Sequence, residues 1–248
     1  KMTLSKISGL NKPYHWRQWN VLWGCVGMGR FVNRCVILIC LICLILPGNA
    51  LAETRTGTLR LLVLGDSLTS GHGLPAAQSF PNQLEAVLRA RGHKLRVING
   101  GVSGDTSAGG LARLDWTMME NPHGVIVELG ANDGFRGMKP RTIRKNISAI
   151  LDRLRSRKTP AMVVGMKAPR NMGKSYVQEF DRLYPSLAKE YGVVFYPFFL
   201  EGVALVPALN QKDGIHPNAS GVAHIVRGIL PMVETLLKQM KAASISQN

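Results

Sequence analysis

The chain has 248 residues and a formal net charge of +16 at pH 7, and 46% of its residues are hydrophobic and 19% are charged. This length and composition are typical of one globular domain with a substantial core, and they exclude an intrinsically disordered or collagen-like chain. All four cysteines lie within the first 43 residues, so the rest of the sequence offers no disulfide, no Cys-x-x-Cys zinc site and no thiolate nucleophile.

A run of twelve apolar residues, 35–46, follows Arg30 and Arg34 near the N-terminus. A helix that spans a bilayer needs about 20 apolar residues, whereas the core of a secretory signal peptide needs about 7–15. The run is therefore typical of a signal peptide, with the two arginines as its positively charged end. An uncleaved membrane anchor is the alternative.

The leader divides the chain into three parts. Residues 50–52 read Ala-Leu-Ala, the small-x-small form that signal peptidase accepts. We therefore predict a signal peptide over 28–52 that is cleaved after Ala52, and a mature domain over 53–248 that is periplasmic or secreted. Residues 1–27 are interpreted as non-native upstream sequence or a misassigned start.

The predicted mature domain is basic. Six of the 31 Lys and Arg residues precede residue 53, so residues 53–248 hold 25 basic and 15 acidic residues, a net charge of +10. Such a surface favours anionic partners, for example phospholipid head groups. The basic residues are spread over the whole chain and no nucleic-acid-binding motif accompanies them, so we expect no nucleic-acid partner.

Beyond the leader, short apolar runs alternate with segments of helical periodicity. The predicted strands are 59–64, 95–99, 125–129, 161–166 and 193–197. The predicted helices are 79–91, 106–119, 143–154, 174–190 and 219–241. Continuously apolar strands that alternate with helices indicate an α/β fold with a parallel sheet covered on both faces. Ligands of such sheets bind beyond the carboxyl ends of the strands, so the loops there are the candidate site.

Three of these loops carry groups suited to acyl chemistry. Ser67 follows the first strand in a Gly-rich turn, where its hydroxyl is exposed and its N–H opens a helix. Gly104 follows the second strand and can present a bare N–H to a ligand, and Asn132 follows the third strand and can present a side-chain amide. Taken singly, each residue is also an ordinary turn residue or helix cap.

The fourth candidate segment precedes the last predicted helix. Asp213 and His216 are three residues apart, a spacing at which the carboxylate can bond Nδ1 and leave Nε2 free to take a proton. A serine, a general base with an orienting acid and two further N–H donors therefore all fall at one edge of the predicted sheet. This set favours a serine hydrolase.

Five segments of the chain resemble the GDSL, or SGNH, hydrolase family, and in particular its bacterial thioesterase I / lysophospholipase L1 (arylesterase) branch. The resemblance covers about residues 59–235, and the segments are LGDSLTSGHGL, SGDTSAGGLARL, VELGANDGFRG, YPFFLEGV and DGIHPNASG. The resemblance implies a flavodoxin-like three-layer α/β/α sandwich of about five parallel strands.

The resemblance also implies a role for each candidate residue. Ser67 would be the nucleophile, His216 the general base and Asp213 the acid that orients it. The oxyanion hole would consist of the N–H groups of Ser67 and Gly104 and the side-chain amide of Asn132. No metal and no cofactor are expected.

The expected substrates are fatty-acyl esters and thioesters, including lysophospholipids at a membrane surface, and the expected state is a monomer. By analogy with the branch, Phe135, Met138, Met166 and Ala168 would line an acyl groove. Ala168 is smaller than the Leu expected there from family members, which leaves the preferred acyl length open. A short-chain carbohydrate acetylesterase and a non-catalytic envelope lipid-binding protein are the alternatives.

Overall fold

A computed structural model of the chain describes residues 57–245. The predicted signal peptide over 28–52, its cleavage after Ala52 and the interpretation of residues 1–27 lie outside the described residues. The described residues lie within the predicted mature domain.

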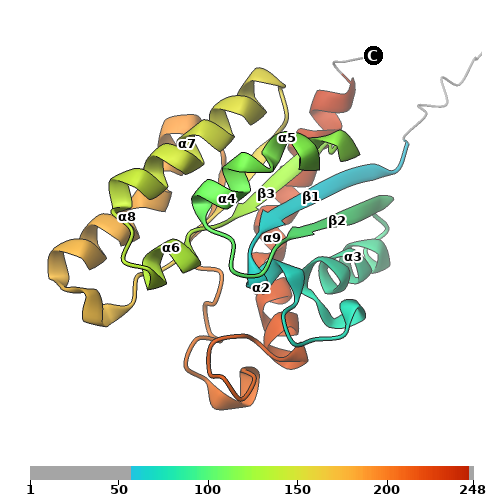
Figure 1. The fold of residues 1–248 in the computed structure, drawn as a ribbon. Helices are drawn as coiled ribbons and strands as arrows, with labels where there is room; N and C mark the ends of the chain where they lie inside the picture. Colours follow the sequence, from blue (N-terminus) through green and yellow to red (C-terminus); the bar gives the residue numbers. More distant parts are fainter. Residues whose placement is uncertain (1–56, 246–248) are drawn as a thin grey trace, which may run out of the picture. The chain divides into compact units, whose positions relative to one another are not determined.

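The centre of the domain is a five-stranded sheet in the order β2-β1-β3-β4-β5 (Figure 1). Every neighbouring pair of strands is parallel. The strands are β1 (Leu59–Gly65), β2 (Leu95–Gly101), β3 (Gly124–Glu128), β4 (Ala161–Val164) and β5 (Val194–Tyr196). All five predicted strands are present, and their ends differ from the prediction by no more than two residues.

Helices cover both faces of the sheet, so the domain is the three-layer α/β/α sandwich that the sequence predicts. On one face α3 packs against α9, and on the other α7 packs against both α4 and α8. The α-helices are α2 (Ser67–Ser70), α3 (Phe80–Ala90), α4 (Ser107–Ala112), α5 (Leu114–Thr117), α6 (Ala131–Phe135), α7 (Pro140–Ser156), α8 (Lys174–Tyr191) and α9 (Ala219–Ile245). Short 3₁₀ turns are η1 (Ala76–Gln78), η2 (Met118–Glu120), η3 (Arg170–Met172) and η4 (Pro207–Leu209).

One predicted helix, 106–119, is wrong as a single element, because α4, α5 and η2 replace it. The break falls at Arg113, which ends α4 and precedes α5. The Arg113 guanidinium bonds the carboxylate of Asp105 at 2.6 Å and the carbonyl of Gly65 at 2.9 Å. These contacts tie the break in the helix to the end of β1.

Among the described residues, α9 alone is long and apolar enough to cross a membrane, with a mean hydropathy of 1.2. Half of that apolar stretch is buried inside the domain. The buried side chains include Ile225, Ile229, Val233 and Leu236, which recur at helical spacing, and α9 contacts β3, β4 and β5. This pattern is that of a core helix of the sandwich.

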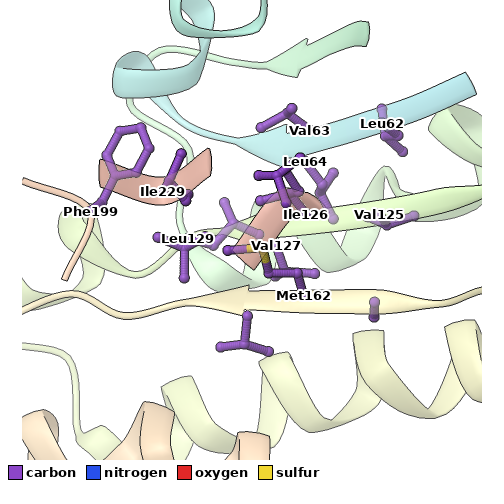
Figure 2. Packing of buried hydrophobic residues seen from close by; sticks show 14 of the residues in the cluster. Leu62, Val63, Leu64, Val125, Ile126, Val127, Leu129, Met162, Phe199 and Ile229 are labelled. Atoms are coloured by element: carbon purple, nitrogen blue, oxygen red, sulfur yellow. The ribbon is translucent and has the colours of Figure 1, made fainter. Parts of the chain in front are cut away.

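The core is built on the two central strands. Leu62, Leu64 and Ile126 are fully buried and lie among apolar side chains of neighbouring elements (Figure 2). Phe199 and Ile229 extend the same cluster toward the loop after β5 and toward α9. Each such side chain contributes roughly 1.5–3 kcal/mol to folding when it is fully buried, so the strands, and the loops at their ends, are held rigidly.

The carboxyl ends of three strands are in register. Gly65 pairs with Gly101 of β2 on one side and with Glu128 of β3 on the other. A Cβ on Gly65 would overlap Thr69 Oγ1 and would lie 2.5 Å from Glu128 Oε2. Only glycine leaves room at this position for the contact between Thr69 and Glu128.

Gly65→Ala tests this packing. We expect the substitution to lower the free energy of unfolding by about 1–3 kcal/mol, the usual cost of forcing extra atoms into a packed interior. Urea unfolding measures the change. Gly57→Ala is the matched control, because nothing lies within 4 Å of a Cβ at Gly57, and equal stability of the two variants would contradict the packing argument.

Candidate active site

A chain of hydrogen bonds joins three of the predicted site residues. His216 Nε2 lies 3.0 Å from Ser67 Oγ, and His216 Nδ1 lies 2.7 Å from Asp213 Oδ2. Ser67 opens α2 directly after β1, whereas the other two residues lie in the loop before α9. The fold therefore brings together residues that are 149 positions apart in the chain.

Asp213 is held in place by its own loop. Its Oδ1 accepts the backbone N–H groups of His216 at 3.0 Å and Ile215 at 2.9 Å. These bonds, together with the imidazole bond, hold the pKa of Asp213 well below its usual range, the His216 N–H having the largest effect. An ionised Asp213 accepts the Nδ1 proton, which leaves Nε2 as the acceptor for the Ser67 hydroxyl.

His72 is a neighbour of this triad that the sequence analysis did not identify. Its ring centroid lies 4.6 Å from that of His216, with the two planes tilted by 43°. Gln211 donates its side-chain N–H to the His72 carbonyl at 2.7 Å, which ties the turn after α2 to the loop before α9. The only signal in the sequence was the position of His72, five residues after Ser67.

Two of the predicted oxyanion donors are backbone N–H groups. In the described part of the chain, the N–H groups of Ser67 and Gly104 donate to no protein acceptor. Gly104 has φ +81°, a conformation that favours glycine, and nothing lies within 4 Å of a Cβ there. Arg136 donates to the Gly104 carbonyl at 2.9 Å and fixes the opposite side of the loop.

The third predicted oxyanion donor, Asn132, lies at the same edge but is engaged. Its Nδ2 donates to Asp66 Oδ2 at 3.1 Å and to the Asp105 carbonyl at 2.9 Å. An amide nitrogen has two hydrogens, so both are in use. Asn132 can serve an oxyanion only when one of these bonds gives way.

A buried acidic pair lies beneath these donors. Asp66 and Glu128 are both fully buried, and Thr69 Oγ1 donates to Glu128 Oε2 at 2.6 Å. Burial raises the pKa of Asp66 to about 6, and burial together with the Asp66 charge raises the pKa of Glu128 well above its usual range. The sequence analysis did not identify Glu128. The signal that could have identified it is an acidic residue inside the apolar run of β3.

The four predicted groove residues differ in exposure. Phe135 is 62% exposed and Met138 is 37% exposed, both just beyond β3. Met166 and Ala168 are packed in the hydrophobic core, whereas Lys167 between them is exposed. That these four residues line an acyl groove stays a prediction.

The groups at this edge are those of nucleophilic catalysis: a hydroxyl, an imidazole, a carboxylate and N–H donors. The distances from Ser67 Oγ to His216 Nε2 and from His216 Nδ1 to Asp213 Oδ2 are those of direct hydrogen bonds. Within residues 57–245, no group of three or more His, Asp and Glu side chains is arranged to hold a metal ion. The described side chains can supply nucleophilic attack and proton transfer.

Glu128→Gln tests the charge state of the buried pair. A group whose pKa is raised by folding stabilises the protein below its ordinary pKa, and that contribution is lost as the pH rises toward the raised value. The stability of the wild type relative to Glu128→Gln should therefore fall by up to about 1.4 kcal/mol per pH unit between pH 5 and 7. Urea unfolding across this range measures it, and a difference independent of pH would contradict a neutral Glu128.

Comparisons with known proteins agree with this geometry. Residues 63–224 match the model of the GDSL-like lipase/acylhydrolase family. The chain is 37% identical to Esterase TesA of Pseudomonas aeruginosa over 80% of this chain and 96% of the relative. It is 37% identical to thioesterase 1/protease 1/lysophospholipase L1 of Escherichia coli K12 over 71% of this chain and 84% of the relative.

The solved structures point the same way. The crystal structure of AlinE4, an SGNH-hydrolase family esterase, superposes with a TM-score of 0.62 at 45% identity, covering 73% of this chain and 97% of that chain. Fold, site geometry and sequence similarity thus agree over the same residues. The chain belongs to the GDSL-like lipase/acylhydrolase family, a family of ester hydrolases.

Proposed function

We propose that the chain is an exported, monomeric serine esterase that hydrolyses fatty-acyl esters and thioesters through an acyl-Ser67 intermediate. The hydrogen-bonded chain from Ser67 through His216 to Asp213 is the observation that carries this proposal. A serine hydroxyl is a weak nucleophile until an adjacent base removes its proton, and His216 lies in position to do so.

In the first half-reaction, Ser67 Oγ attacks the acyl carbonyl carbon and its proton passes to His216 Nε2. The N–H groups of Ser67 and Gly104 bind the oxyanion, and Asn132 adds a third donor. Asp213 stabilises the imidazolium. The C–O or C–S bond of the substrate then breaks, and His216 returns the proton to the leaving alcohol or thiol.

In the second half-reaction, water attacks the acyl-enzyme. His216 accepts the proton of the water and delivers it to Ser67 Oγ as the acid departs. The same donors bind the second oxyanion. These residues supply the nucleophile, the proton transfers and the oxyanion donors of both half-reactions.

Exposed apolar side chains around the site favour an apolar acyl group. Nine large hydrophobic residues are exposed within residues 57–245, and six of them lie in segments beyond the carboxyl ends of the strands: Val102, Phe135, Met138, Leu205, Val206 and Ile215. Leu205 is 91% exposed, and Ile215 directly precedes His216. Exposed apolar side chains are typical of interaction sites, and these lie in the segments that follow the strand ends, as Ser67, Gly104 and Asn132 do.

Basic residues in the same segments favour an anionic lipid surface as the source of substrate. Arg136, Lys139 and Lys212 form no ion pair with any acidic residue of the described chain. Apolar side chains beside unpaired cations suit a lipid with an anionic head group. The E. coli relative is named a thioesterase and lysophospholipase, and a lysophospholipid fits both features.

Export rests on the leader. The apolar run 35–46 and the Ala-Leu-Ala sequence at 50–52 have the form of a cleaved signal peptide. An exported enzyme meets envelope lipids rather than cytosolic acyl thioesters, so lysophospholipids and free fatty-acyl esters are the proposed physiological substrates.

Ser67→Ala should abolish covalent labelling by a fluorophosphonate, because the reagent reacts with an activated serine hydroxyl. Intact-mass spectrometry of residues 53–248 measures the adduct. Ser175→Ala, at an exposed position in α8, is the matched control and should be labelled like the wild type. Labelling of Ser67→Ala to the wild-type extent would refute the nucleophile assignment.

The proposed acyl preference can be measured with p-nitrophenyl esters from acetyl to palmitoyl. Each buried CH₂ contributes up to about 0.8 kcal/mol, or roughly fourfold, so kcat/KM should rise steeply to a maximum at medium or long chains. Ser67→Ala supplies the blank. A maximum at acetyl with collapse beyond butyryl would contradict the proposal and indicate a short-chain acetylesterase.

A further inference from the structure

We propose that the buried carboxyls of Asp66 and Glu128 act as a pair that carries one negative charge, on Asp66, and that this charge makes Asp66 the positioning residue for Asn132. The inference rests on the proposed esterase function, since Asn132 is its third oxyanion donor. Its tests include one measurement that does not depend on activity.

Asp66 connects the nucleophile turn to Asn132. Its Oδ1 accepts the N–H of Leu68 at 3.0 Å, which caps α2. Its Oδ2 accepts the Asn132 amide at 3.1 Å. One carboxylate therefore sets the orientation of the turn that carries Ser67 and also that of the amide across the site.

Glu128 lies behind Asp66 and is incompletely satisfied. Its Oε2 accepts the hydroxyl of Thr69 at 2.6 Å and the N–H of Asp66 at 3.4 Å. Its Oε1 is buried and has no partner among the described residues. A buried carboxylate oxygen without a donor is costly, whereas a protonated carboxyl avoids burying the charge, so Glu128 holds the proton of the pair.

The surrounding groups favour a single negative charge. The carboxyl oxygens of Asp66 receive donors from Leu68 and Asn132, and protonated His216 favours its ionised form. Asp105, which is ion-paired with Arg113 at 2.6 Å, opposes ionisation of Asp66. Tyr184 of α8 also interacts with both carboxyls of the pair, and its hydroxyl donates to the Leu129 carbonyl. Asp133 of α6 interacts in turn with Tyr184.

The two bonds of the Asn132 amide are unequal. A hydrogen bond to an ionised acceptor is roughly twice as strong as one to a neutral acceptor. The bond from Asn132 Nδ2 to the Asp105 carbonyl is therefore the one that breaks when the amide donates to the oxyanion. The bond to Asp66 Oδ2 remains. Protonation of Asp66 weakens this anchor, and the amide then loses its orientation.

The first test is Asp66→Asn. The new side chain can still accept from Leu68 N–H, but its NH₂ then faces the NH₂ of Asn132. We expect kcat to fall at least about tenfold, up to the roughly 10²–10³-fold of a lost oxyanion donor, with KM within about twofold. A fall in kcat/KM that comes from KM alone would contradict positioning of Asn132.

The pH profile separates positioning from a structural role. In the wild type, protonation of Asp66, whose pKa burial raises to about 6, weakens the anchor of Asn132 and lowers kcat. The acid limb of log kcat/KM should therefore be steeper in the wild type than in Asp66→Asn, which has no charge at this position to lose. Equal acid limbs in the two proteins would overturn the proposal.

The second test is infrared spectroscopy in deuterated buffer at neutral pH. The wild type should show the C=O band of a protonated carboxylic acid, and Glu128→Gln should lack it. Absence of the band from the wild type would show that Glu128 is ionised and would overturn the single-charge pair. If the wild type hydrolysed no ester, the proposed function would fail while this band still reported on the pair.

Discussion

The register of three parallel strands is the constraint on which the active site depends. Gly101, Gly65 and Glu128 stand in one row at the carboxyl ends of β2, β1 and β3. Neighbouring strands lie about 4.8 Å apart, and Ser67, Gly104 and Asn132 follow the row within four residues. The chain leaves β1 and β3 toward opposite faces, at the switch point where ligands of open α/β sheets bind. The buried core (Figure 2) maintains this register.

Two acidic side chains are buried at the carboxyl ends of β1 and β3, although acidic side chains are rarely fully buried. β3 is buried throughout, yet it ends in Glu128, and Asp66 directly follows the buried end of β1. Departures from the apolar pattern of this kind are expected at functional sites. Here Asp66 joins the turn that carries Ser67 to Asn132, and Glu128 lies behind Asp66 and Thr69. The N–H groups of Ser67 and Gly104 donate to no acceptor in the described part of the chain, whereas Asn132 must release one of its two bonds before it can serve an oxyanion.

Much of this arrangement could be predicted from the sequence, because strand periodicity and loop residues are local signals. Apolar runs gave the five strands, and the triad residues follow strand ends or precede α9. Contacts between distant segments could not be predicted in this way: Arg113 breaks a predicted helix through bonds to Asp105 and Gly65, and Met166 turns into the core. Gly104 and Asn132 lie where expected, but no local pattern indicated that Asp66 already holds the Asn132 amide.

In the proposed mechanism, Ser67 carries the acyl group during turnover. To test this step, residues 53–248 are mixed with a medium-chain p-nitrophenyl ester and quenched in acid within the first turnover. The peptides are then mapped by mass spectrometry. We expect one acyl group per chain, on the peptide that contains Ser67, and we expect it to disappear as the substrate is exhausted. Rapid hydrolysis with no acyl adduct at any quench time, or an adduct on another residue, would contradict it.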